Sequence, residues 1–269
     1  MQINELTSAA NENIKRWKKL AFTPRANHKF GLTIAEGLHL AEVIAQRQVP
    51  AKSVILRQNR NSGEADVFAQ EIQLQCAARI YELPEALYEA ICPVEASTGI
   101  MVEIECASSL RPAVPLSVDA LYLDGVQDAG NMGTLIRTAV AAGVKHIAAS
   151  RTSSGFWTPK VLRAGMGAHF AAHLYENVAP DEIHALFNAR IIAADARGGV
   201  DLFRTQAWEE GTTVWMMGAE GPGLSDAALD VADMRCLIPI EDDCESLNVA
   251  AAASVCLFEQ RRRRLVGNL

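Results

Sequence analysis

The sequence has few of the features that mark membrane, secreted or metal-binding proteins. No apolar run approaches the roughly 18 residues of a membrane-spanning helix, and the polar residues 1–19 predict neither a signal nor a transit peptide. The six cysteines are scattered without a CxxC pair, which predicts reduced thiols rather than disulfides or a zinc site. His169 and His173 have the spacing of metal ligands on a helix, but no HExxH motif or obvious third ligand accompanies them. We therefore expect a cytoplasmic protein that holds no metal.

Positive charge is also scarce overall, and it gathers near the two ends. A net charge of −7 over 269 residues argues against a generic nucleic-acid-binding surface. Composition favours solvated helix faces for both basic clusters, with a C-terminal turn that suits the helix dipole, and local phosphate contact is the alternative. Trp17, which lies among lysines, is expected to anchor its helix rather than stack on a base. The four basic residues near the C-terminal end are Arg261, Arg262, Arg263 and Arg264. The N-terminal candidates for RNA binding are Lys15, Arg16, Lys18, Lys19, Arg25 and Lys29.

The order of helix-like and strand-like segments predicts two α/β domains. Residues 1–106 alternate amphipathic helices with short strands, and residues 107–118 contain two prolines and no helical period, which is typical of a linker. In residues 119–269, apolar strands and helices alternate more regularly. This pattern predicts a mostly parallel sheet covered by helices on both faces, with a ligand site where strands end and loops begin.

Three strand-to-loop junctions in the second domain carry unusual residues. In residues 124–143 a strand leads to a loop with Asn131 and then to a helix bearing Arg137. In GAEGPGLS, residues 218–225, three glycines surround Glu220, as in a backbone folded tightly around a flat ligand. In residues 238–252, Ser246 is placed at the expected N-cap of the last helix, with Asn248 two positions on. Each junction alone is compatible with an ordinary turn, loop or helix cap.

Together and in this order, the three junctions resemble the motifs of the SpoU (TrmH-like) family of RNA 2′-O-ribose methyltransferases, of the SPOUT class. The first motif, N-x-G-x-x-x-R-T-A, is similar to residues 131–139, and the second, G-x-E-x-x-G-L, to residues 218–224. The third, I-P followed by S-L-N-V, is similar to Ile238-Pro239 and Ser246–Val249. The N-terminal part resembles the accessory RNA-binding domain of two-domain members through GLTIAEG, residues 31–37, and STGIMVEI, residues 97–104.

The resemblance implies a fold, a cofactor and a set of roles. It implies a C-terminal domain with a deep trefoil knot that binds S-adenosylmethionine, a homodimer, and an RNA substrate, with ribosomal RNA favoured over tRNA. The residues expected to bind the cofactor are Gly218, Gly223, Ile238, Pro239 and Leu247. Those expected at the reacting groups are Asn131, Arg137, Glu220, Ser246 and Asn248. Because a guanidinium stays protonated, we expect Arg137 to bind a phosphate and stabilise the developing 2′-oxyanion rather than act as a base.

Two other classes of protein compete with this hypothesis. A catalytically silent RNA-binding relative would have no need to retain all the motif residues. A nucleotide-binding α/β enzyme would use GAEGPG as its phosphate loop, but the spacing is not GxGxxG and no P-loop lysine is present. Binding of S-adenosylmethionine, of neither ligand, or of NAD distinguishes the three.

Overall fold

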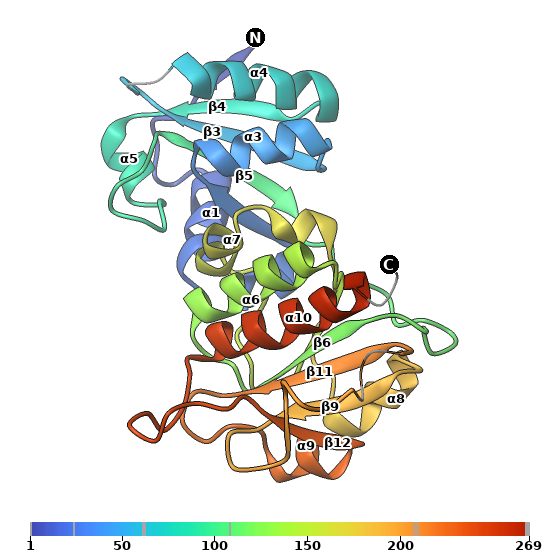
Figure 1. Cartoon of the computed structure of the whole chain (residues 1–269). Coiled ribbons are helices and arrows are strands. Elements are labelled where there is room, and N and C mark those ends of the chain that lie inside the picture. The colour runs from blue at the N-terminus through green and yellow to red at the C-terminus, as the bar shows by residue number, and fades with distance from the viewer. Residues whose placement is uncertain are drawn as a thin grey trace. The chain divides into compact units, whose positions relative to one another are not determined.

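The computed structural model describes residues 2–23, 25–60, 63–107, 109–206, 208 and 210–266 (Figure 1). Its contacts form two compact units. Unit 1 holds residues up to 107 together with residues 157–170, and unit 2 holds the remainder. No helix in these ranges is long and apolar enough to cross a membrane. The mixed α/β architecture with a mostly parallel sheet confirms the fold class expected from the sequence.

Unit 1 is built on a sheet whose strands lie in the order β1-β4-β3-β5-β2. β1, β3 and β4 are parallel to one another, and β5 runs antiparallel to β2 and β3. The strands are β1 (Ile3–Glu5), β2 (Leu32–Glu36), β3 (Ala51–Arg57), β4 (Arg79–Leu83) and β5 (Ile100–Glu105). The helices are α1 (Glu12–Phe22), α2 (Ala26–Phe30), α3 (Leu38–Arg47), α4 (Gly63–Cys76), α5 (Glu85–Glu89) and α7 (Pro159–Gly165).

Helix α1 shows how the basic N-terminal segment is anchored. Ile14, Trp17 and Leu20 recur at helical spacing and are buried, while the lysines between them are exposed. Trp17 is fully buried and packs edge-on against Tyr81, with 5.3 Å between ring centroids. The expectation that Trp17 anchors its helix is therefore confirmed.

Residues 157–170 leave unit 2 and pack within unit 1. The Thr33 hydroxyl in β2 donates to the Trp157 carbonyl at 2.6 Å, and Arg163 in α7 bonds the buried Glu36 at 2.6 Å. The two histidines do not lie on one helix, so they lack the helical arrangement of metal ligands. His169 lies in a 3-10 turn (Ala168–Ala171), and His173 begins β8 (His173–Tyr175).

In the described part of unit 2, seven parallel strands lie in the order β10-β12-β9-β11-β6-β7-β8. The strands other than β8 are β6 (Ala120–Asp124), β7 (His146–Ala149), β9 (Arg190–Ala194), β10 (Val200–Asp201), β11 (Thr213–Gly218) and β12 (Met234–Leu237). The helices are α6 (Ala129–Ala142), α8 (Ile183–Leu186), α9 (Asp226–Asp230) and α10 (Val249–Val266), with a 3-10 turn at Pro180–Glu182.

Side chains alternate between the two faces of this sheet, as strand geometry requires. Tyr122 and Met216 belong to the core cluster beneath α8 and α9. Trp215, which precedes Met216 and is in register with Leu121, points to the opposite face, where its indole N–H donates to Gln260 of α10. Helices α6 and α10 lie side by side over that second face (Figure 1).

Candidate active site

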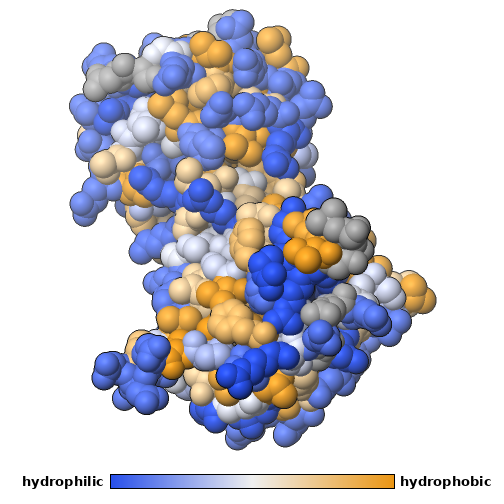
Figure 2. Space-filling view, viewed as in Figure 1, coloured by the Kyte–Doolittle hydropathy of each residue, from blue (hydrophilic) through white to orange (hydrophobic). Residues whose placement is uncertain are grey.

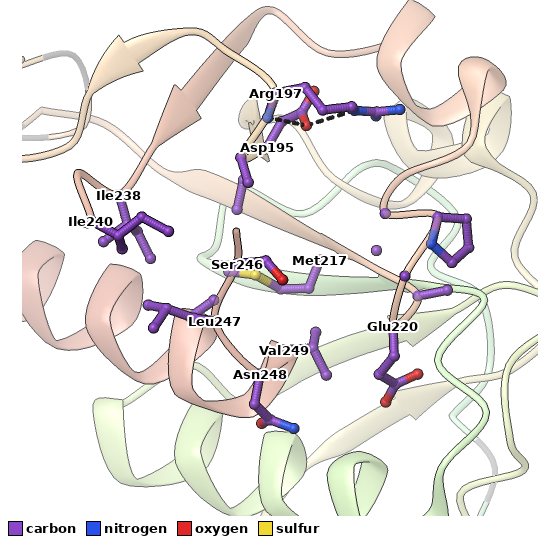
Figure 3. Close-up of a pocket in the computed structure, with 18 of the residues that line it drawn as sticks. Asp195, Arg197, Met217, Glu220, Ile238, Ile240, Ser246, Leu247, Asn248 and Val249 are labelled. Atoms are coloured by element: carbon purple, nitrogen blue, oxygen red, sulfur yellow. Dashed lines mark hydrogen bonds and ion pairs between the residues drawn. The ribbon is translucent and has the colours of Figure 1, made fainter. Parts of the chain in front are cut away.

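A pocket of about 370 Å³ opens at the carboxyl ends of three adjacent strands of unit 2, β9, β11 and β12 (Figure 3). Its lining comes from the loops after these strands and from the start of α10: residues 194–197, 217–223, 236, 238, 240, 246–249 and 252. This is the edge of a parallel sheet at which ligands bind in open α/β folds, and the volume suits a small organic ligand.

The glycine loop after β11 folds back on itself. Ala219 and Gly223 exchange two backbone hydrogen bonds of 3.0 Å, and Gly221 and Gly223 have positive φ angles of 90° and 75°. A Cβ on Gly218 would lie 2.1 Å from the backbone carbon of Gly223, so only glycine fits there. At the far end of the loop, the Ser225 N–H donates to the buried Asp124 carboxylate at 2.9 Å. The loop is therefore held at both ends and presents main chain to the pocket.

A chain of hydrogen bonds joins one residue from each of the three motifs. The Asn248 amide donates to Asn131 Oδ1 at 3.1 Å, and the Asn131 amide donates to Glu220 Oε1 at 2.5 Å. Asn131 is placed by the Asp128 carboxylate, which accepts its backbone N–H at 2.7 Å and caps α6. Residues 131, 220 and 248, far apart in sequence, thus meet at one side of the pocket.

The third motif begins α10 differently from the expected arrangement. The Asn248 carboxamide oxygen accepts the Ala250 N–H at 2.9 Å and caps the helix, which begins at Val249. The assignment of Ser246 as N-cap is therefore wrong, and Ser246 instead lies in the preceding loop, where it lines the pocket. Asn248 is the N-cap because it directly precedes the first helical residue, so its side chain can accept a backbone N–H of the first turn.

The pocket wall opposite Glu220 is apolar. Ile238, Ile240 and Leu247 lie together on one side of it in Figure 3. Pro239 lies between two lining residues but does not itself line the pocket. Cys236 also lines the pocket, and burial raises the pKa of its thiol to about 12, so it stays protonated and is no nucleophile at neutral pH.

Two charged residues of the pocket, Asp195 and Arg197, escaped the sequence-based reasoning. They follow β9, and Arg197 donates from Nε to Asp195 Oδ1 at 2.9 Å. Burial opposes ionisation of Asp195, but hydrogen bonds from Arg197 and Arg235 lower the pKa of its carboxyl. The signal that could have found them is their position directly after an apolar strand, at the same sheet edge as the motifs.

Arg137 is exposed and does not line this pocket. It lies on the solvent side of α6 with Thr134 and Ala141. Within the described ranges it makes no hydrogen bond or ion pair, which leaves its guanidinium available to a ligand.

The N-terminal candidates for RNA binding belong to unit 1. Arg16 is committed to the fold, since it forms a two-pronged ion pair with the buried Glu103 at 2.6 and 3.0 Å. Lys15 pairs with the exposed Glu12 at 2.7 Å. The other four, Lys18, Lys19, Arg25 and Lys29, are exposed.

Comparison with known proteins identifies the family. The model of the SpoU rRNA methylase family matches residues 120–258, more than half of the chain. The chain belongs to this family.

One named relative and one solved structure cover nearly the full length of this SpoU protein, and a second relative covers about half of it. The Bacillus subtilis 23S rRNA guanosine 2′-O-methyltransferase RlmP is 28% identical, over 96% of this chain and 100% of its own. The Shewanella oneidensis enzyme RlmB is 36% identical over 54% of this chain and 59% of its own. The AdoMet-bound rRNA methyltransferase of Sinorhizobium meliloti superposes with a TM-score of 0.83 at 26% identity, covering 97% of this chain and 98% of that one.

Proposed function

We propose that this SpoU protein transfers a methyl group from S-adenosylmethionine to a ribose 2′-hydroxyl of ribosomal RNA. It is an RNA 2′-O-methyltransferase, as its relatives are named, and S-adenosylmethionine is its cofactor, as in the AdoMet-bound neighbour. The observation that carries the proposal is the hydrogen-bond chain through Asn131, Glu220 and Asn248, which joins all three family motifs beside one pocket.

The pocket residues fit this cofactor. The volume of about 370 Å³ is within the range for small-molecule sites. Ile238 and Leu247 offer an apolar wall for a flat base, and Gly218 and Gly223 leave main-chain groups open toward the bent remainder. Pro239 shapes the turn between Ile238 and Ile240 in this proposal.

The protein has to align the ribose 2′-hydroxyl with the methyl group and assist loss of its proton, rather than form a covalent intermediate with the substrate. The bound cofactor supplies an activated methyl group on its sulfonium. Arg137 holds a neighbouring phosphate and stabilises negative charge on the 2′-oxygen, and Ser246 and Asn248 orient the ribose or its loops. Glu220 and Asn131 keep the motifs in register through their hydrogen bond.

Unit 1 is proposed to be the accessory RNA-binding domain, and unit 2 the methyltransferase domain. The exposed residues Lys18, Lys19, Arg25 and Lys29 support this, because their charges remain available to phosphates. The names of RlmP and RlmB favour 23S rRNA as the substrate class, and tRNA is the second candidate.

We also propose a knotted, dimeric arrangement that acts in the cytoplasm. The last helix follows β12 and packs on α6, which carries the first motif, and in this proposal that return of the C-terminal segment passes through the knot. On α10, Phe258 and Leu265 are 45% and 58% exposed, and exposed apolar side chains on one helix suit contact with a second copy. Figure 2 shows hydrophobic patches among hydrophilic residues on the face that it draws. Equilibrium sedimentation tests the dimer, and a crystal structure tests the threading.

Methyl transfer itself gives the direct test. Labelled S-adenosylmethionine is offered with unmodified total rRNA and, separately, unmodified total tRNA, and the product is digested. We expect label in an alkali-resistant dinucleotide from rRNA. Label recovered from tRNA alone would make tRNA, not rRNA, the substrate. Failure to bind the cofactor would favour the catalytically silent RNA-binding relative.

A further inference from the structure

Arg197 is the one cationic side chain among the described residues that line the pocket. The acidic ones are Asp195 and Glu220. Figure 3 shows Arg197 and Glu220 on different sides of the pocket. The apolar wall of Ile238, Ile240 and Leu247 forms a third side. The pocket therefore separates its positive group from Glu220.

The Arg197 guanidinium is fixed but not saturated. Its Nε donates to Asp195 Oδ1 at 2.9 Å, and one Nη2 proton points to the Leu224 carbonyl at 3.3 Å. A guanidinium has five N–H donors, so three have no partner within the described ranges. The side chain is half exposed, and its Nη2 would lie 3.8 Å from a Cβ placed on Gly223, so it reaches the glycine loop.

Arg197 shares its carboxylate partner with a second arginine. The Asp195 carboxylate, with only 4% of its side chain exposed, pairs with Arg197 at 2.9 Å and with Arg235 at 2.5 Å. Asp226 is a further acidic group near Arg197, so the feature that favours an anion here is the set of spare N–H donors rather than a net positive charge. A preorganised cation with spare donors favours a planar anion that accepts two hydrogen bonds.

We propose that Arg197 binds the α-carboxylate of the methionine part of S-adenosylmethionine. This inference rests on the proposed function, because it names a further contact to the same cofactor. The carboxylate is the only anionic group of that molecule at neutral pH, whereas its ammonium and sulfonium groups are cations. A phosphate of the RNA substrate is the competing anion for the same guanidinium.

Calorimetric titration of the full chain with two ligands separates these possibilities. The ligands are S-adenosylmethionine and its decarboxylated form, which lacks only the carboxylate, and the variant is Arg197→Gln. We expect about 10- to 100-fold weaker binding of S-adenosylmethionine, the effect of losing a charge-assisted hydrogen-bond pair, and a change below about threefold for the decarboxylated ligand. Arg204→Gln is the matched control, since Arg204 is 87% exposed and lies outside the pocket lining.

Methylthioadenosine, which lacks the whole amino-acid part, reports whether the variant pocket is intact. Equal binding of this ligand to the wild type and Arg197→Gln shows that the fold is retained. Equal losses for both main ligands, or unchanged binding of S-adenosylmethionine with weaker binding of rRNA, would overturn the inference. If the wild type bound none of these ligands, the proposed function itself would fail, which is a different outcome.

Discussion

The basic run at the end of α10 and the basic cluster of α1 and α2 look alike in sequence but differ in their surroundings. Arg263 donates to the Phe203 carbonyl at 2.7 Å and lies over the Trp208 ring at 5.5 Å. Arg264 donates to the Gly211 carbonyl at 2.8 Å and to the Asp119 carboxylate. By contrast, Lys18 and Lys19 are exposed.

The expectation of a solvated helix turn is therefore wrong for Arg263 and Arg264. Their side chains are 11% and 24% exposed and bind the carbonyl groups of Phe203, Trp208 and Gly211, while Arg262 remains 60% exposed. Arginine suits this task because its planar fork reaches several carbonyl groups at once, whereas lysine is a compact, strongly hydrated charge. A run of positive residues thus reports charge, and only its partners show whether that charge is available to RNA.

Arg137 differs from Arg263 and Arg264, because it is exposed and makes no hydrogen bond or ion pair with the described residues. Arg137→Lys keeps the charge but loses the fork, and we expect at least about 100-fold slower methyl transfer with unchanged affinity for the cofactor. Single-turnover kinetics and cofactor titration measure the two quantities. Arg262→Lys is the control, with near-normal turnover expected. Near-normal turnover of Arg137→Lys would remove Arg137 from the reaction.

Arg16 is the exception within the N-terminal cluster. Its removal in Arg16→Ala leaves the Glu103 carboxylate, which is fully buried, with the Ser53 hydroxyl as its remaining hydrogen-bond partner among the described residues, at 2.9 Å. We expect the free energy of unfolding to fall by about 3 kcal/mol, the cost of an uncompensated buried charge. Chemical denaturation of Arg16→Ala and of the exposed control Lys18→Ala measures this. Equal free energies of unfolding for the two variants would show that Arg16 does not stabilise the fold and is no different in this respect from Lys18.

Arg264→Ala tests the structural role of the C-terminal run. The substitution removes one ion pair and the bond to the Gly211 carbonyl, so we expect a loss of about 2 kcal/mol in the free energy of unfolding. Arg262→Ala removes a pair in which the arginine is 60% exposed and leaves Glu259 paired with Arg263, so it should cost less, about 0.5 kcal/mol. If Arg264→Ala weakened RNA binding without changing the free energy of unfolding, the arginines at the end of α10 would bind RNA rather than stabilise the fold, and the two basic regions would not differ.

The double variant Lys18→Ala/Lys19→Ala tests availability to RNA. Each lost phosphate contact should reduce the slope of log affinity against log salt by about 0.7 to 0.9. Filter binding of rRNA fragments at several salt concentrations measures the slope, and Arg262→Ala, whose charge is matched by Glu259, should leave it unchanged. An unchanged slope in the double variant would assign both lysines to solvation alone.

The smallest effect concerns pH. Hydrogen bonding from Arg262, against a smaller opposing effect of burial and with further help from Arg263, lowers the pKa of Glu259 from 4.5 to about 2. A carboxyl with a lowered folded-state pKa stabilises the fold above the unfolded value and loses that contribution as pH falls toward the folded one. The stability gap between wild type and Glu259→Gln should therefore be present at pH 7 and shrink between about pH 4.5 and 2. Chemical denaturation at pH 7 and near pH 2 measures the difference in unfolding free energy between the two proteins, and an equal difference at both pH values would contradict this prediction.

Much of the fold followed from local patterns. Alternating apolar strands and amphipathic helices indicated two α/β parts with a mostly parallel sheet, since side-chain periodicity acts over a few residues. The motifs pointed to one sheet edge, and Glu220, Ser246, Leu247 and Asn248 do line one pocket there. Periodicity contained no sign that residues 157–170 pack in unit 1, because that position depends on bonds such as Thr33 to Trp157.

By itself, the sequence determined the order of strands and helices, the family motifs and the residue types available for chemistry. Tertiary structure decided which of those groups are already used. Arg264 meets Asp119 across 145 positions, and Asn248 meets Asn131 across 117. Asp195 pairs with Arg197 of its own loop and with Arg235 of β12. Such partners are set by how the chain brings distant segments together, because hydrogen bonds act over about 3 Å and take no account of separation along the chain.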